Sequence, residues 1–219
     1  MFSFFKHKNT IRETDEEFLA KSSYDAIQKL TAAYIKELSA EDNEKMLDYL
    51  LDTVTRDLCT SMLAKPLYQG YSNSLFVSFP THYYDKNGIK RSIEDEEVAV
   101  ELNQAHIYLS PWNNERTKNN LLNLFDKEFH YDELNHVAFY FPDINLCHIA
   151  NGNHSINAGR YLKKGTILAT QCDIKKLFPH VCTDGYKWYN THSGEPFGWV
   201  GDFRLSAIYL IAKTKHQLN

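Results

Sequence analysis

The sequence predicts an α+β fold in which an N-terminal helical region precedes a mixed sheet with flanking helices. Apolar residues recur at helical spacing through roughly the first sixty residues. From about residue 105 the pattern changes to short apolar runs separated by polar turns. The 219-residue chain is 43% hydrophobic and 14% aromatic, which is enough to build a core. We therefore expect a helical region over residues 1–65 and an α/β region over residues 66–219.

Two amphipathic helices are predicted in the N-terminal region. Their apolar residues lie three or four positions apart on either side of the polar break SAEDNE: Ile27, Leu30, Tyr34 and Leu38 before it, and Leu47, Leu50, Val54 and Leu58 after it. Each helix should bury one stripe of its surface. Neither stretch contains a reactive constellation, so we interpret the region as a helical cap or as a docking surface for a protein partner.

The next elements are predicted from composition and turn signals. The run SLFVSFP, residues 74–80, is typical of a strand, and Asn87-Gly88 indicates a tight turn. An S-x-x-D pattern followed by an acidic, then apolar, run indicates a helix over about residues 93–103.

Strands and helices alternate through the rest of the chain. Strands are predicted at 105–110, 136–141, 144–150 and 166–172, and helices at 114–127, 155–164 and 202–216. Seven of the nine glycines lie at or after residue 152, so tight turns and close backbone approaches are concentrated in the last third of the chain. A functional site is expected there.

The segment 184–203 combines six aromatic residues with four glycines. Aromatic rings on such a loop can stack on a base and cover a nucleotide, in which case Lys187, His192 and Glu195 would face the ligand. The alternative, which the pattern favours, is that the rings form the core of an irregular C-terminal lobe.

Composition narrows the classes of function. A formal net charge of -4 excludes a protein coated in basic surface, so nucleic acid would have to bind a local patch. The four cysteines show no CxxC spacing and no export signal is present, which predicts reduced, cytoplasmic thiols without a disulfide or a structural zinc. No apolar stretch approaches the roughly 20 residues that span a bilayer. Frequent lysine and asparagine indicate an AT-rich bacterial or phage genome; the oligomeric state stays open.

The string Asn151-Gly152-Asn153-His154-Ser155 lies between a predicted strand and a predicted helix. Such a corner points free backbone N–H groups outward at the positive end of the helix dipole, which favours anions. Asn153 or Ser155 can cap the helix, and His154 can contact a phosphate or transfer a proton near neutral pH. The alternative is structural: a turn, a cap, and a surface or packed histidine.

The order of elements around this string resembles the ParB/sulfiredoxin-like superfamily. The resemblance covers residues 105–175 and rests on a strand, a polar G-x-H corner, the helix INAGRYLKKG and the strand TILATQC, preceded by the unit HIYLSPWNNERTKNNLLNLF. Gly152 and His154 match the corner of that family, and Ala158 matches a small position in its helix. The resemblance implies a mixed sheet with flanking helices and a site for nucleotides or phosphoryl groups at the corner.

The resemblance also implies which residues act. His154 would be catalytic, and the phosphate or nucleotide would be bound by residues from two segments: Asn151, Gly152, Asn153 and Ser155 from the corner, and Asn113, Arg116 and Thr117 from the upstream loop and helix. Members of the superfamily include nucleotide-hydrolysing partitioning clamps, nucleases, and a branch that reduces cysteine sulfinic acid with ATP. Asn153 stands where that branch has its catalytic cysteine, so sulfinic-acid reduction is not expected. Ser155 stands where an arginine usually follows, which removes a bidentate phosphate contact.

A second cluster is a candidate metal site and contains His130, Asp132, Glu133 and His136 in FHYDELNHV. Glu-x-x-His is a metal-ligand spacing on helices. The segment is predicted to link a helix to a strand, where acidic and histidine side chains are usually solvated, so no metal site is predicted.

The sequence supports two hypotheses of function. In the first, the protein binds a nucleotide or nucleic-acid phosphate at the corner and hydrolyses phosphate esters as a nuclease or nucleotidase, with a nucleotide and magnesium as the candidate cofactor. In the second, catalysis has been lost and the protein is a binding module that docks a protein partner through its N-terminal helices. The missing arginine and cysteine favour the second hypothesis, and His154 and the clustered glycines favour the first.

Overall fold

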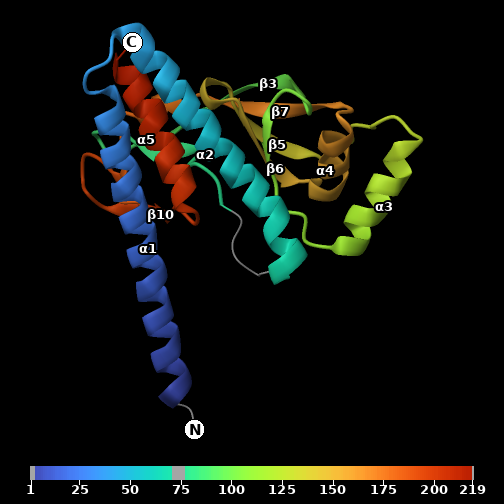
Figure 1. Cartoon of the computed structure of the whole chain (residues 1–219), viewed down its shortest axis with the longest axis horizontal. Coiled ribbons are helices and arrows are strands. Elements are labelled where there is room, and N and C mark those ends of the chain that lie inside the picture. The colour runs from blue at the N-terminus through green and yellow to red at the C-terminus, as the bar shows by residue number, and fades with distance from the viewer. Residues whose placement is uncertain (1–2, 71–76, 219) are drawn as a thin grey trace.

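The computed structural model describes residues 3–70 and 77–218, with side chains described from residue 15 onward in those ranges. The fold is α+β, as predicted (Figure 1). The helices are α1 (Ser3–Ile35), α2 (Ala40–Gln69), α3 (Asn114–Phe125), α4 (Asn153–Leu162) and α5 (Phe203–Leu218). Among the described residues, no helix is both long and apolar enough to cross a membrane.

The strands of the described chain form three sheets. A hairpin contains β1 (His82–Tyr84) and β2 (Lys90–Ser92), and a three-stranded sheet contains β8 (Val181–Thr183), β9 (Lys187–Asn190) and β10 (Pro196–Trp199). A five-stranded mixed sheet has the order β3-β7-β5-β6-β4, from β3 (Glu94–Glu101), β4 (His106–Tyr108), β5 (Val137–Phe141), β6 (Leu146–Asn151) and β7 (Thr166–Cys172). Because β4 runs parallel to β6 while β5 runs antiparallel to it, β4 and β6 end where β5 begins.

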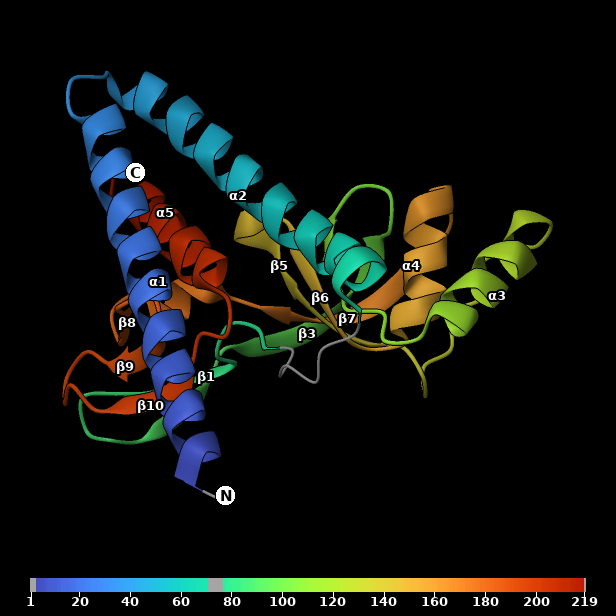
Figure 2. The same cartoon turned by 60° about the horizontal axis from the view of Figure 1, so that its bottom comes forward.

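Helices α1, α2 and α5 pack together beside the sheets, and the N-terminal end of α1 projects away from the rest of the molecule (Figures 1 and 2). Helix α2 begins after Ser39, whose side chain accepts a hydrogen bond from the Asp42 N–H. The apolar stripe predicted from its spacing is buried, as Leu47, Leu50 and Leu58 show.

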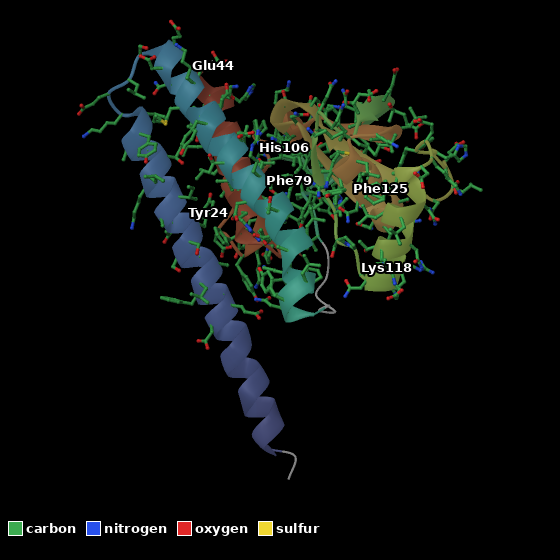
Figure 3. All side chains as sticks on the ribbon, turned by 45° about the vertical axis from the view of Figure 1, so that its right-hand side comes forward. Tyr24, Glu44, Phe79, His106, Lys118 and Phe125 are labelled. Carbon is green, nitrogen blue, oxygen red and sulfur yellow. The ribbon has the colours of Figure 1, made fainter. Side chains whose placement is uncertain are left out.

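Two clusters of buried side chains fill the interior. The larger one joins α2 and α5 to the sheets and includes Leu58, Phe79, Phe141, Trp188 and Tyr209. Figure 3 labels Phe79 and His106 beside α2, and His106 Nε2 lies 3.1 Å from Asp52 Oδ1 of that helix. The domain boundary expected at residue 65 therefore falls inside a helix, α2, that shares its core with the C-terminal elements.

The helix predicted over residues 93–103 is wrong, because Glu94–Glu101 form strand β3, which pairs antiparallel with β7. Val98 and Val100 alternate with outward-facing residues, and Val100 is buried. This alternation suits a strand with one face covered. The Ser92 hydroxyl, interpreted as a helix cap, instead accepts a hydrogen bond from the backbone two residues further on, just before the strand.

The remaining predicted elements from residue 105 onward are confirmed with shifted ends. The strand predicted over residues 74–80 lies partly outside the described residues, and residues 77–80 form no strand. Within the segment 184–203, residues 187–190 form β9 and residues 196–199 form β10, joined and flanked by turns. Its aromatic residues contribute to the core, which is the alternative that the sequence pattern favours, since Trp188 is 2% exposed.

The buried His148 of β6 should make the stability of the protein depend on pH. Its ring stacks on Phe139, and burial lowers the pKa of His148 to about 4. Because an unfolded histidine takes up its proton near pH 6.5, the contribution of His148 to stability is complete above about pH 6.5 and is lost as the pH falls towards 4. We expect wild-type protein to lose about 2 kcal/mol more than His148→Gln between pH 7 and pH 5 in urea denaturation. An equal loss in the two proteins would contradict this.

Candidate functional site

Residues 151–155, called the corner below, join β6 to α4 at the end of the five-stranded sheet where β4 also ends and β5 begins. Helix α3 lies alongside α4 at the outer side of the molecule (Figures 1 and 2). Lys118 and Phe125, labelled in Figure 3, mark the course of α3. The corner is therefore bordered by the sheet end, by α3, and by the loops that lead into α3 and β5.

Gly152 has a φ of 84°, in the left-handed region that favours glycine. A Cβ at this position would overlap Cδ2 of His136 and lie 3.0 Å from the carbonyl oxygen of Asn135. The Asp132 N–H donates to Nδ1 of His136, so Nε2 carries the proton of the neutral ring and donates to the Ser155 hydroxyl at 2.8 Å. That hydroxyl donates to the Gly152 carbonyl oxygen at 3.1 Å. The side chain of Ser155 thus ties the corner to the loop before β5.

Two asparagines predicted to bind a ligand make hydrogen bonds within the protein. The Asn153 Oδ1 accepts a hydrogen bond from the Ser110 N–H at 2.8 Å, which joins α4 to the end of β4. Asn113 is the N-cap of α3, and its Oδ1 accepts a hydrogen bond from the Arg116 N–H at 3.0 Å. Asn113 thus caps α3, and it is not among the described residues that line the pocket at the corner.

His154 is only 7% exposed. Its Nδ1 lies 3.1 Å from the Thr117 hydroxyl, which donates its own proton to the Asn113 carbonyl oxygen at 3.0 Å. With the hydroxyl proton on that carbonyl oxygen, the neutral ring donates from Nδ1 and keeps a lone pair on Nε2. Burial and, second, the charge of Arg116 lower the pKa of His154, so the ring is neutral at neutral pH.

The side chain of His154 is covered rather than open to solvent. The ring lies edge-on to Trp112, with ring centroids 5.2 Å apart, and Nε2 is buried without a hydrogen-bond partner among the described residues. Removing this side chain would therefore disturb packing as well as any ligand contact.

A pocket of about 290 Å³ opens at the corner. It is lined by the corner itself and by residues from α3 and the adjoining loops: Trp112, Arg116, Asn120 and Asn135. Arg116 lies over Trp112, 4.9 Å from the ring centroid. The N-cap of α4 is Gly152, and no side chain caps this helix, so its first N–H groups stay available to a ligand.

The charge of the pocket is positive. Among the described lining residues Arg116 is the one charged side chain, and none is a carboxylate. Arg116, the helix N-terminus and the amides of Asn120 and Asn151 suit a phosphate group. A magnesium ion would find no carboxylate here and would have to be held by the phosphates of the ligand.

The structure adds four residues that the sequence prediction missed. Asn120 lies one helical turn after Arg116, a spacing that could have placed both on the same face of α3. Trp112 directly precedes the predicted loop residues and carried no signal of its own. Asn135 and His136 lie next to the corner because β5, which follows them, pairs with the end of β6. The local sequence does not reveal this pairing. No residue of 184–203 is among the described residues that line this pocket, so that segment does not cover the corner.

The cluster weighed as a metal site has a structural role at His136. Both ring nitrogens of His136 are engaged, with the Asp132 N–H and with the Ser155 hydroxyl. In the part of the chain that the structure describes, no group of three or more histidine, cysteine, aspartate or glutamate side chains is arranged to hold a metal. The four cysteines are free thiols; Cys182 is exposed and the other three are buried.

The model of a family of unknown function, DUF6710, matches residues 3–219. No curated protein matches the chain, and no solved structure matches it.

Proposed function

We propose that this chain, which belongs to the DUF6710 family, binds a phosphate group of a nucleotide or nucleic acid at the corner. The observation that carries the proposal is the N-terminus of α4, which no side chain caps, in a pocket whose described lining has Arg116 as its one charged side chain and no carboxylate. The buried Nε2 of His154, which has no partner among the described residues, suits the water molecule of the reaction proposed below rather than the phosphate. The resemblance of residues 105–175 to ParB/sulfiredoxin-like proteins supports the same class of ligand.

Each part of the pocket has a role in this proposal. The first N–H groups of α4 and the guanidinium of Arg116 attract phosphate oxygens. Trp112 is 55% exposed although Arg116 lies over its ring, so it offers a surface on which a base can stack. The pocket therefore fits a phosphate joined to a base better than it fits inorganic phosphate.

The reaction class that we propose is hydrolysis of a phosphate ester, as a nuclease or nucleotidase performs it. The lone pair on Nε2 and the lowered pKa of His154 suit a general base. His154 would take a proton from a water molecule while the oxygen of that water forms a bond to phosphorus and the ester P–O bond breaks. Because Nε2 is shielded from solvent in this structure, the step requires the neighbouring side chains to shift when the ligand binds.

A thermal-shift screen of the full chain tests binding. Nucleoside mono-, di- and triphosphates, a short single-stranded DNA and inorganic phosphate would each be titrated with and without magnesium. A ligand should stabilise the protein by about 2.7 kcal/mol at a hundred times its Kd. Arg116→Gln should remove the shift, whereas Lys118→Gln, which changes an exposed cation on the same helix, should not. A screen without any shift would overturn the proposal.

Replacing His154 with asparagine should separate its catalytic role from its structural role. Asparagine keeps an N–H near the position of Nδ1 and so can still donate to Thr117, but it has no Nε2. We expect hydrolysis of a chromogenic phosphodiester to fall by at least about 100-fold. Stability should fall by about 1 kcal/mol, compared with about 2 kcal/mol for His154→Ala, which also loses the hydrogen bond. Undiminished hydrolysis by His154→Asn would show that the histidine is not catalytic.

The second candidate function is docking of a protein partner on α1. Phe18 and Leu19 are 70% and 61% exposed on this helix, whose N-terminal end projects from the molecule (Figure 2). Adjacent exposed apolar side chains of this size suit a contact with a helix of a partner. This function is favoured if the phosphate screen is negative and the double variant Phe18→Ser, Leu19→Ser loses a complex that the wild-type protein forms.

A further inference from the structure

We propose that a second pocket, between α2, α3 and α4, binds the carboxylate group of a small amphipathic molecule. This pocket has a volume of about 220 Å³ and lies on the other side of the Thr117–His154 hydrogen bond from the corner pocket, since Thr117 lines the one and His154 the other. Its walls are apolar where α2 and α3 contribute Leu63, Leu67 and Leu121. This site is independent of the function proposed for the corner.

The head group of the ligand is inferred from Arg160. Among the described residues that line this pocket, Arg160 is the one charged side chain; its Nε is buried without a hydrogen-bond partner, and no ion pair of Arg160 is present in the described chain. Withdrawing a guanidinium from water is costly unless an acceptor replaces the water. Arg204 shows how this protein satisfies a buried arginine, because two carboxylates bind it. Arg160 has no such partner among the described residues, and its Nε is closed off from solvent, so a carboxylate that enters the pocket would supply the acceptor.

The rest of the pocket selects a carboxylate with an apolar body. A bare inorganic anion would pair with Arg160 but leave the leucine walls uncovered. A neutral hydrocarbon would cover the leucine walls but leave Arg160 without an acceptor. Leu67 and Tyr161 are 78% and 63% exposed beside the pocket, where an apolar chain can cover them. A single guanidinium matches one carboxylate in charge and in its two parallel hydrogen bonds, whereas a phosphate dianion would keep an uncompensated charge. The volume is below the roughly 300–1,000 Å³ typical of drug-sized ligands, which indicates a short chain.

Calorimetric titration of the full chain with matched probes tests the proposal. Hexanoate should bind at one saturable site, and hexanamide, which is uncharged and of similar shape, should bind at least tenfold more weakly. Arg160→Met removes the charge but keeps an extended side chain, and should weaken hexanoate binding at least tenfold. Arg116→Met, which alters the corner pocket, is the control and should leave hexanoate binding unchanged.

The ligand-free variant gives a second, independent readout. Arg160→Met should melt at the same temperature as wild-type protein or higher, because it removes a desolvated charge that no protein group pairs. The proposal is overturned if Arg160→Met binds hexanoate as wild type does, if hexanamide binds equally well, or if the ligand-free variant melts several degrees lower. Nucleotide shifts that persist in Arg160→Met would show that the two pockets act separately.

Discussion

Replacing Gly152 with valine is expected to lower the free energy of unfolding by about 4 kcal/mol and to abolish phosphate binding at the corner. The left-handed φ of 84° costs a β-branched residue about 2 kcal/mol. Overlap of the new Cβ with the His136 ring costs about 2 kcal/mol more. The ring cannot move aside easily, because hydrogen bonds from the Asp132 N–H and to the Ser155 hydroxyl hold it.

The matched control for this variant is Gly194→Val. Gly194 also has a left-handed φ, of 74°, but a Cβ there would meet nothing within 4 Å. The free energy of unfolding of the control should therefore fall only by the cost of the left-handed conformation, about 2 kcal/mol. Urea denaturation of the two variants beside wild type measures the difference, and equal losses would show that the His136 ring is not the obstacle.

The elements that could be predicted from the sequence are those whose periodicity is visible within a few turns. The buried stripe of α2 follows directly from the spacing of Leu47, Leu50 and Leu58. Strand β3 was mistaken for a helix because its acidic start resembles the first turn of a helix. The segment is a strand because it pairs with β7, where Val98 lies opposite Ala169. No local pattern in the sequence indicates this pairing.

The location of the candidate site was predictable, but the roles of its side chains were not. A glycine between a strand and a helix marks the corner, and Gly152 does adopt the left-handed conformation that such a turn requires. The burial of His154 depends on Trp112 and Thr117, which reach it only because α3 packs against α4. Sequence adjacency says nothing about such contacts, so the sequence could not decide between a surface histidine and a packed one.

The structure also changes the chemistry that His154 can offer. The sequence allowed it to donate to a phosphate oxygen or to act as a base. When the Thr117 hydroxyl donates its proton to the Asn113 carbonyl oxygen, the neutral ring donates from Nδ1 and Nε2 has a lone pair. A phosphate oxygen, itself an acceptor, would gain nothing from that nitrogen, whereas a water molecule would. The hydrogen-bond chain on α3 therefore favours proton abstraction over phosphate contact.

Arg204→Ala is expected to lower the free energy of unfolding by about 3 kcal/mol. Arg204 is 6% exposed, and its guanidinium donates to Asp202 Oδ2 at 2.6 Å, to Asp57 Oδ2 at 2.9 Å and to Ser61 Oγ at 2.7 Å. Burial alone would lower the pKa of Arg204, but the hydrogen bonds to Asp202 and Asp57 raise it, so the charge is firmly held. Removing the guanidinium would leave the carboxylate of Asp202, which is itself largely buried, without its cationic partner.

The matched control is Arg56→Ala, which removes an arginine with an equally short contact, 2.6 Å from Nε to Asp52 Oδ2. That pair is exposed and lies within one turn of α2, so its loss should change stability little. Arg204 differs because it joins α5 to Asp57 and Ser61 on α2. Hydrogen exchange should accordingly show lost protection along α2 in Arg204→Ala and normal protection in Arg56→Ala. If the two variants unfold at the same denaturant concentration, the Arg204 network does not fasten α2 to α5, and the apolar core alone must hold them together.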